Sequence, residues 1–466
     1  MSQTAPIKVC TLDLERLPAE VSTRHPEGGR YRGLWLLVRG NGRPLQMLRL
    51  TPTGRDAEGI DRERLRLHIE RAGVDVRDIA PGVQAPERAK APRISVIVPS
   101  TLARREGLCR CLESLEALDY PDAELLLVDN RRDGDGRHPQ WLERFPAVRV
   151  LHERRPGISA ARNRGLGEAG GELVAFTDDD VTVDPGWLSA LAARFAARPE
   201  EACVTGLVIP AELETPAQVM LERYYEGGGY GPTIFKPVSH RLLPCPDGVA
   251  RGHRGMVGQF DDDDRLLRDF SLYAAGTFGA GANMAFRTAA LRAVGGFDES
   301  LGAGMPSCGG EDLGMFVQLA WRGHSVGFEP AALVHHTHRR DDSALRKHIE
   351  GYGVGFSALM VALVDYDRRH LEAMLAILPR GVRSLLGTYA RKLRGRSGQT
   401  GIAEGASAAS ENGAAGHGAA AAATDGGTPN DEHRRAMSRL ARLELRGMAR
   451  GPAAYRSSRR LVRERR

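Results

Sequence analysis

The chain has 466 residues, which is enough for two or three domains of roughly 100–200 residues each. Its formal net charge of +6 is unevenly placed, because residues 431–466 hold 12 Arg and 4 acidic residues (net +8) and residues 1–430 carry a net of −2. The body of the chain therefore lacks the broad basic surface of a nucleic-acid-binding protein, and we expect no nucleic-acid partner.

Residues 1–80 are predicted to form a small α+β unit whose role the sequence does not reveal. Residues 31–38 and 45–50 have the composition of two strands, and Arg-Gly-Asn-Gly at 39–42 is typical of a hairpin turn. A charged helical pattern follows them. Residues 81–92, with three prolines and mixed charge, predict a linker.

Strand and helix patterns alternate along residues 93–340. The predicted strands are residues 94–98, 123–128, 148–151 and 172–177, and the predicted helices include residues 105–117 and 159–167. Such alternation is typical of an α/β fold with a parallel sheet covered by helices. Residues 341–394 are predicted to be a helical extension, and residues 395–430, rich in Ala, Gly and Ser, to be disordered.

In the basic tail, residues 431–466, apolar side chains recur at roughly helical spacing among arginines. They are Met437, Leu440, Leu443 and Met448. Two interpretations stay open: a solvated or disordered basic segment, and an amphipathic helix that lies reversibly on an anionic membrane. No run approaches the roughly 18 apolar residues of a membrane span, and no signal peptide is recognisable. We therefore expect a cytoplasmic protein with peripheral contact at the inner face of the cell membrane.

The most informative stretch lies where an apolar run gives way to acids. Residues 174–177 have the composition of a buried strand, and Asp178, Asp179 and Asp180 follow at once. Carboxylates at the carboxyl edge of a parallel sheet project into the crevice where open α/β proteins bind ligands. Three adjacent negative charges repel unless they are solvated or share a cation, and oxygen ligands suit Mg²⁺ or Mn²⁺. The alternative interpretation is a solvated acidic turn.

Four further patterns place polar residues at the end of a strand or the start of a helix. They are the strand 94–100 ending in Pro-Ser, the strand 125–130 ending in Asp-Asn, the segment Arg155-Pro-Gly-Ile-Ser-Ala-Ala-Arg-Asn-Arg-Gly165, and Gly309-Gly-Glu-Asp312 followed by His335-His-Thr-His338. Each has a structural alternative: an acid in a turn, surface arginines, an acidic helix cap, or packed imidazoles. Their order and spacing together are far more specific than any one of them.

This ordered set resembles the inverting family 2 glycosyltransferases, over about residues 93–340. The resemblance implies the GT-A fold, a Rossmann-like mixed sheet found in nucleotide-diphospho-sugar transferases. It also implies a hexosyl or related sugar transferred with inversion from a nucleotide-sugar donor to a hydroxyl, and Mg²⁺ or Mn²⁺ as cofactor. The expected acceptor is a glycan or a lipid-linked molecule of cell-envelope synthesis.

The same resemblance implies roles for individual residues. Those expected to contact the donor are Pro99 and Ser100 beside the nucleotide, Asp129 at the base, Arg162 near the diphosphate or base, and Asp178 and Asp179. Those expected to hold the metal are Asp178 and Asp180, the ends of an Asp-x-Asp pattern, completed by His336 or His338. Three adjacent aspartates leave the register open, so Asp179 remains an alternative ligand. Asp312 matches the catalytic base, with Glu311 beside it.

Elementary chemistry agrees with these roles. A leaving nucleoside diphosphate carries concentrated negative charge that a divalent ion neutralises. An acceptor hydroxyl is a poor nucleophile until a carboxylate removes its proton, and attack opposite the leaving group inverts the anomeric centre. The glycine-rich residues 276–284 either shape a donor-sugar pocket through close backbone approach or form a plain turn.

Three other functions are less compatible with the sequence. Processive synthases of this family usually carry Gln-x-x-Arg-Trp, whereas residues 318–322 end in Trp321-Arg322. A sugar-phosphate nucleotidyltransferase usually has a glycine-rich loop after its first strand, and residues 100–105 contain no glycine. A non-catalytic glycan- or nucleotide-binding scaffold has no need of both acidic motifs.

Overall fold

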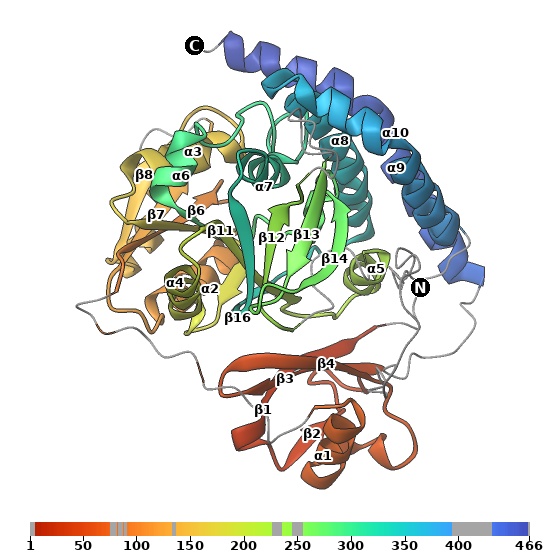
Figure 1. Ribbon diagram of the computed structural model, residues 1–466. Helices are drawn as coiled ribbons and strands as arrows, with labels where there is room; N and C mark the ends of the chain where they lie inside the picture. The colour runs from red at the N-terminus through yellow and green to blue at the C-terminus, as the bar shows by residue number, and fades with distance from the viewer. Residues whose placement is uncertain are drawn as a thin grey trace.

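A computed structural model describes residues 5–74, 82, 87, 91–132, 137–225, 235–244, 255–393 and 431–464. The segment 395–430, expected to be disordered, and most of the expected linker 81–92 lie outside the described residues. A small N-terminal unit, a large sheet with helices on both faces, and a group of long helices along one side make up the described part (Figure 1). Among the described helices, none is both long and apolar enough to span a membrane.

The N-terminal unit is built from short strands around one helix. Its elements are β1 (Ile7–Asp13), β2 (Glu20–Ser22), β3 (Gly33–Gly40), β4 (Arg43–Leu50), β5 (Gly59–Asp61) and α1 (Arg62–Arg71). β3 and β4 form the predicted hairpin, and both Asn41 and Gly42 have positive φ in its turn, as a twist-matched hairpin requires. β1, which the sequence analysis did not predict, lies parallel to β3.

The central sheet has 11 strands in the order β14-β13-β12-β16-β11-β15-β9-β6-β7-β8, and β10 pairs with β16. The strands are β6 (Ile94–Ser100), β7 (Ala123–Asp129), β8 (Val148–His152), β9 (Leu173–Phe176), β10 (Val181–Val183), β11 (Glu201–Pro210), β12 (Val238–Leu242), β13 (Met256–Phe260), β14 (Leu266–Ser271), β15 (Met284–Arg287) and β16 (Ser325–His336). The four predicted strands correspond to β6–β9, which run parallel. β15 joins β9 in antiparallel orientation, so the sheet is mixed.

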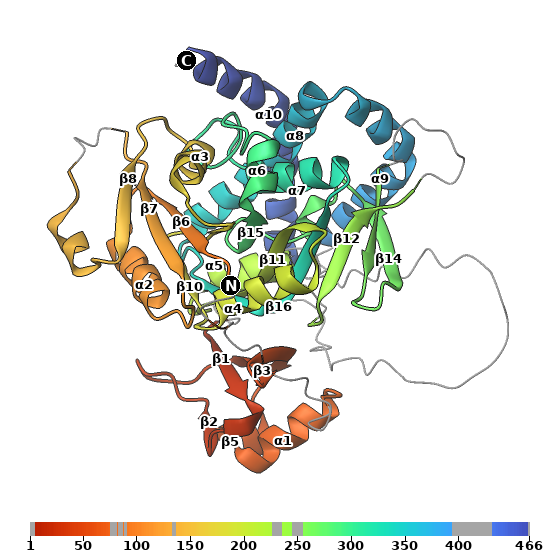
Figure 2. The same ribbon diagram turned by 60° about the vertical axis from the view of Figure 1, so that its left-hand side comes forward.

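Helices cover both faces of this sheet, as Figures 1 and 2 show. They are α2 (Arg105–Glu116), α3 (Ile158–Glu168), α4 (Trp187–Ala197), α5 (Pro216–Tyr224), α6 (Thr288–Ala293) and α7 (Glu311–Trp321). Along β6, Val96 and Val98 belong to the apolar core that contains α2 and α4, whereas Ile97 belongs to the core that contains α3 and α7. Alternate side chains are thus buried on both faces, which explains the continuous apolar run of this strand.

The N-terminal unit packs directly on the central sheet (Figure 2). Leu37 of β3 shares an apolar cluster with Leu207 of β11 and Leu333 of β16. An ion pair at 2.6 Å joins the Arg39 guanidinium to the Asp184 carboxylate beyond β10. The unit is therefore held to the larger domain by apolar and ionic contacts.

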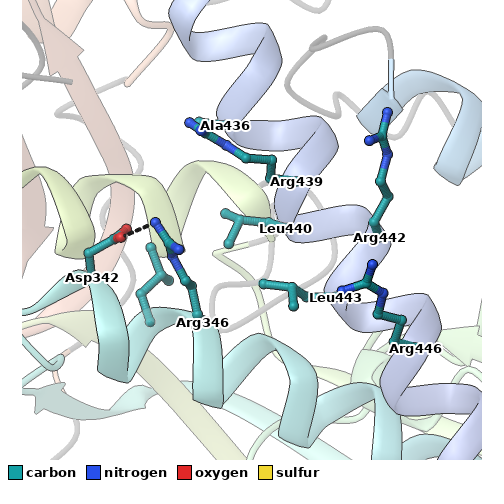
Figure 3. Close-up of a pocket in the computed structure, with 9 residues that line it drawn as sticks. Asp342, Arg346, Ala436, Arg439, Leu440, Arg442, Leu443 and Arg446 are labelled. Atoms are coloured by element: carbon teal, nitrogen blue, oxygen red, sulfur yellow. Dashed lines mark ion pairs between the residues drawn. The ribbon is translucent and has the colours of Figure 1, made fainter.

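Three long helices follow the sheet, namely α8 (Asp342–Tyr366), α9 (Arg369–Leu393) and α10 (Asp431–Arg463). The tail is helical, but Met437 and Leu440, which the membrane hypothesis assigned to lipid, are buried against α5 and α8. Figure 3 shows Leu440 and Leu443 pointing toward α8 beside a pocket of about 250 Å³, with Arg439, Arg442 and Arg446 around it. The apolar face of α10 is thus occupied by protein.

Glycines allow α8 and α10 to cross closely. A Cβ added at Gly447 would lie 2.2 Å from the Glu350 carbonyl oxygen, and one at Gly353 would lie 2.1 Å from the Glu444 carbonyl oxygen. Both obstacles are backbone atoms, which cannot rotate away. The crossing therefore requires glycine at these positions.

We predict that Gly447→Leu lowers the free energy of unfolding by about 1–3 kcal/mol, the usual cost of forcing extra atoms into a packed contact. Urea denaturation would measure the change. Ala449→Leu, an exposed position on the same helix, is the matched control and should leave stability nearly unchanged. Equal stability of both variants would contradict the packing of α10 on α8.

Candidate active site

The predicted site residues meet at one edge of the sheet because three parallel strands end there. Ser100 at the end of β6 lies beside Asp129 at the end of β7. β9 pairs with β6 up to Phe176, so the chain leaves the sheet directly into Thr177 and the aspartates. The carboxyl edge of the parallel strands thus carries the polar residues, as the sequence analysis predicted.

Asp179 points into the protein. Its carboxylate accepts a hydrogen bond of 2.6 Å from the Ser100 hydroxyl and pairs with the Arg104 guanidinium. Only 5% of the residue is exposed. The Ser100 contact distinguishes Asp179 from its two neighbours, whereas Arg104 pairs with Asp180 as well, and the Ser100 contact favours the Asp178–Asp180 register of the Asp-x-Asp pattern.

Asp178 faces a buried arginine. The Arg162 guanidinium, 1% exposed, donates to Asp178 Oδ1 at 3.2 Å and to Glu311 Oε1 at 2.9 Å. Burial disfavours a charged guanidinium, but the surrounding carboxylates outweigh it and raise the pKa of Arg162. Burial also raises the pKa of Asp178, against the charge of Arg162. Protein groups thus engage Arg162, and its contact with a donor remains a prediction.

Asp312 lies in the first turn of α7. Asp312 Oδ1 accepts from the Leu313 amide and Oδ2 from the Gly281 amide, both at 2.8 Å. A Cβ at Gly281 would lie 2.9 Å from Asp312 Oδ2 and 3.1 Å from Arg162 Nη2, so only glycine permits this approach. Gly281 thus approaches protein side chains closely, and the predicted part of residues 276–284 in a donor-sugar pocket stays a prediction.

Glu311 and Asp312 differ in surroundings despite being adjacent. Glu311 is buried and held by Arg162, and burial together with the charge of Asp312 raises its pKa to about 7. Asp312 is partly exposed, and backbone amides hold both of its oxygens in place. Of the two predicted catalytic acids, Asp312 is therefore the more exposed, and its catalytic role stays a prediction.

Asp180 begins a hydrogen-bonded chain that leads to α5. Asp180 Oδ1 lies 3.3 Å from His336 Nε2. The Nδ1 atoms of His336 and His338 are 3.1 Å apart, and His338 Nε2 lies 2.6 Å from Glu222 Oε1. Burial opposes ionisation of Asp180, but His336 and Arg104 outweigh it and lower the pKa of Asp180. His336 is therefore the predicted histidine that faces the triplet, and His338 supports it from behind.

These groups fit a hard divalent cation in kind, since carboxylate oxygens and an imidazole nitrogen converge at Asp180 and His336. In the described part of the chain, the aspartate triplet and these histidines do not bring three ligand atoms within 4.8 Å of one another. Arg104 lies against both Asp179 and Asp180 instead and supplies the positive charge that the cluster requires. A cation at this edge would compete with that guanidinium.

Asp129, His138 and His152, at the ends of β7 and β8 and in the loop between them, do bring three possible ligand atoms within 4.8 Å of one another. The His138 and His152 rings are stacked with centroids 4.7 Å apart, and His152 Nδ1 lies 3.3 Å from Asp129 Oδ2. Arg131 also binds Asp129, with Nη2 2.7 Å from Oδ2. The carboxylate expected to accept a hydrogen bond from a nucleobase is thus paired within the protein, and that role stays a prediction.

Sequence analysis missed several residues that shape this edge. Arg104 could have been predicted from the sequence, because it lies in the loop directly after β6 and therefore at the same edge of the sheet as the aspartates. Glu222 and His152 gave no local signal, since only the fold brings α5 and β8 to these histidines and acids. Pro99 and Ser100 lie in register with Val128 and Asp129, as expected for neighbouring strand ends.

Part of the chain is similar to known glycosyltransferases. Residues 95–294 match the family model described as glycosyl transferase family 2. The "Pre-mycofactocin glycosyltransferase" of Mycobacterium tuberculosis is 26% identical over 306 residues, which are 64% of this chain and 54% of that protein. The "Glucosyl-dolichyl phosphate glucuronosyltransferase" of Haloferax volcanii is 27% identical over 136 residues, 28% of this chain and 44% of that protein. The chain thus spans about half the length of these relatives or less.

A solved structure of the mannosyltransferase PcManGT from Pyrobaculum calidifontis, in complex with GDP-Man and Mn²⁺, aligns with 79% of this chain and 89% of that chain. Its TM-score is 0.41 at 15% sequence identity. The family match and the mixed α/β sheet confirm the predicted GT-A fold class. The likeness to glycosyltransferase family 2 is carried by residues 95–294, which are less than half of the chain.

Proposed function

We propose that this protein is a metal-dependent inverting glycosyltransferase that moves a sugar from a nucleotide-sugar donor to a hydroxyl acceptor. One observation carries the proposal: Arg162 and Gly281 join the acidic triplet to Asp312. Arg162 contacts both Asp178 and Glu311, and its Nη2 donates to the Gly281 carbonyl at 3.3 Å, while the Gly281 amide holds Asp312. Asp178, proposed for the donor side, and Asp312, proposed for the acceptor side, are therefore connected through Arg162 and Gly281.

In this proposal Asp312 is the general base. Its carboxylate is oriented by two backbone amides and partly exposed, so it can take the proton of an acceptor hydroxyl as that oxygen attacks. A single displacement from the face opposite the diphosphate inverts the anomeric centre. Glu311, buried against Arg162, positions the start of α7 and does not meet the substrate.

Asp178, Asp180 and His336 are the proposed ligands of Mg²⁺ or Mn²⁺, which would offset the charge of the leaving diphosphate. Asp179, held by Ser100 and Arg104, keeps this loop in place. His338 and Glu222 orient His336, because an imidazole ligand is commonly fixed by a hydrogen bond to its second nitrogen. Pro99, Ser100 and Asp129 border the proposed nucleotide.

We further propose a glycan or lipid-linked acceptor of the cell envelope. The Haloferax volcanii relative is named for glucosyl-dolichyl phosphate, which is a lipid-linked sugar. An acceptor of this kind would require the protein to work at a membrane surface from the cytoplasmic side.

Thermal-shift measurements with a panel of nucleoside diphosphates test donor binding. Because a ligand that binds only the folded state stabilises it by about 2.7 kcal/mol at a hundredfold excess over Kd, one diphosphate should raise Tm clearly. We predict that this rise needs Mn²⁺ or Mg²⁺ and disappears with EDTA. A Tm that no diphosphate changes, with or without metal, would contradict the proposed donor site.

A further inference from the structure

The helix α9 has an exposed apolar face. Five large aliphatic side chains are 43–66% exposed, namely Leu371, Leu375, Leu378, Val382 and Leu386. Their spacing of three or four residues places them on one side of the helix. A surface helix normally turns polar residues to water, and exposed apolar patches of this kind mark interaction sites.

The opposite side of α9 already packs on the protein. His370, Ala373 and Ile377 are buried, and Ala373 and Ile377 belong to the main apolar core of the α/β domain. The exposed aliphatic residues are therefore a second apolar face, which intramolecular packing of the described residues leaves in contact with solvent. We call these five side chains the outer face of α9.

The charge of α9 identifies the partner that suits this face. Residues 369–393 contain five basic residues and one acidic residue, a net of +4. Arg383 is exposed, as is Arg368 just before the helix; Arg369 is exposed too but pairs with Asp367, with Nη2 2.6 Å from Oδ2. Aliphatic side chains flanked by arginines match the boundary of an anionic lipid bilayer, where acyl chains lie beneath negative headgroups. Two copies of the chain facing each other here would oppose like charges.

We propose that the outer face of α9 lies in the interface of an anionic lipid membrane and docks the protein there. This places membrane contact at α9, whereas the sequence analysis considered it for α10 as one of two open interpretations. The apolar side of α10 is taken up by α5 and α8, and the outer face of α9 is free of such contacts among the described residues.

The start of α9 is tied to the helix that carries Asp312. Trp321 at the end of α7 stacks on His370, with ring centroids 4.0 Å apart, and its indole donates to Asp367 Oδ2 at 2.9 Å. Docking through α9 would therefore fix α7 relative to the bilayer. If the proposed function holds, this arrangement presents a lipid-linked acceptor to an active site on a fixed helix.

Vesicle co-sedimentation of the full chain tests the proposal. We expect binding to vesicles of phosphatidylglycerol and phosphatidylcholine, weak binding to phosphatidylcholine alone, and at least a tenfold loss of affinity for the anionic vesicles in Leu375→Glu/Leu378→Glu. These side chains are 58% and 52% exposed, so folding should survive and Tm should stay unchanged. Leu266→Glu/Leu267→Glu on β14, 52% and 49% exposed, is the matched control and should bind as the wild type does.

Three results would overturn the proposal. The first is unchanged vesicle binding by the α9 variant, and the second is an equal loss of vesicle affinity in the β14 control. The third is a dimer in solution that the α9 variant converts to a monomer, which would identify a second copy of the chain as the partner. Because the assay needs no nucleotide or sugar, its failure is distinct from failure of the proposed glycosyl transfer.

Discussion

Replacing Asp312 with asparagine should lower kcat for sugar transfer by about 10²- to 10⁴-fold, the range expected when a general base is lost. Asparagine keeps one acceptor oxygen, for either the Leu313 or the Gly281 amide, but it cannot take a proton, and Asp312 is not among the proposed donor or metal ligands. The metal-dependent Tm shift with nucleoside diphosphate should therefore remain. Steady-state kinetics together with thermal shift would separate loss of chemistry from loss of binding.

Glu311→Gln is the matched control for this result. Glutamine keeps an oxygen for the 2.9 Å contact with Arg162 and removes only the charge of a buried side chain. We expect a much smaller loss of kcat than with Asp312→Asn. A larger loss in Glu311→Gln, with Asp312→Asn still active, would show that the base had been assigned to the wrong acid.

Asp180→Asn should remove the metal dependence of nucleotide binding and lower kcat/KM by about 10²- to 10³-fold, similar to losing one strong electrostatic contact to a developing charge. Asp180 is the aspartate that faces His336, with 3.3 Å between Oδ1 and Nε2. An amide is a weaker ligand for a hard cation than a carboxylate. Titration of Mn²⁺ in the presence of the preferred nucleoside diphosphate would measure the effect.

Asp263→Asn, in the exposed turn between β13 and β14, provides a control for the loss of one negative charge elsewhere. It should leave Mn²⁺ affinity and kcat/KM unchanged. If Asp180→Asn retained wild-type Mn²⁺ affinity while a variant of Asp129 or His152 lost it, the metal would belong to the group at the end of β7 and β8.

The sequence predicted the sheet edge well because its signals are local. An apolar run that ends abruptly in polar residues marks a buried strand and its end, and parallel strands bring such ends together. That reasoning placed Ser100, Asp129 and the triplet at one edge. It did not need any knowledge of which side chains would touch.

Pairing between side chains was less predictable, because partners distant in sequence decide it. Three adjacent aspartates look equivalent along the chain, and only the Ser100 hydroxyl singles out Asp179, because Arg104 pairs with both Asp179 and Asp180. Arg162 looked like a residue for a diphosphate, yet the fold surrounds it with protein carboxylates.

The two basic amphipathic helices show the same limit. α9 and α10 both combine arginines with regularly spaced aliphatic residues, so their sequences do not reveal which apolar face meets protein. Glycines at the α8–α10 crossing allow the two backbones to approach closely, so α10 is the helix that packs along α8. The sequence analysis left the tail open between a solvated segment and a membrane helix, and the structure shows Met437 and Leu440 of that tail packed against α5 and α8.

The central claim is that this acidic edge, with a divalent cation, transfers a sugar from a nucleotide-sugar donor. Release of nucleoside diphosphate from a panel of nucleotide sugars, measured with Mn²⁺ and again after chelation, tests it most directly. We predict release from one class of donor that stops with EDTA and returns with added Mn²⁺. Turnover that chelation leaves unchanged, or pyrophosphate formed from a sugar phosphate and a nucleoside triphosphate, would contradict it.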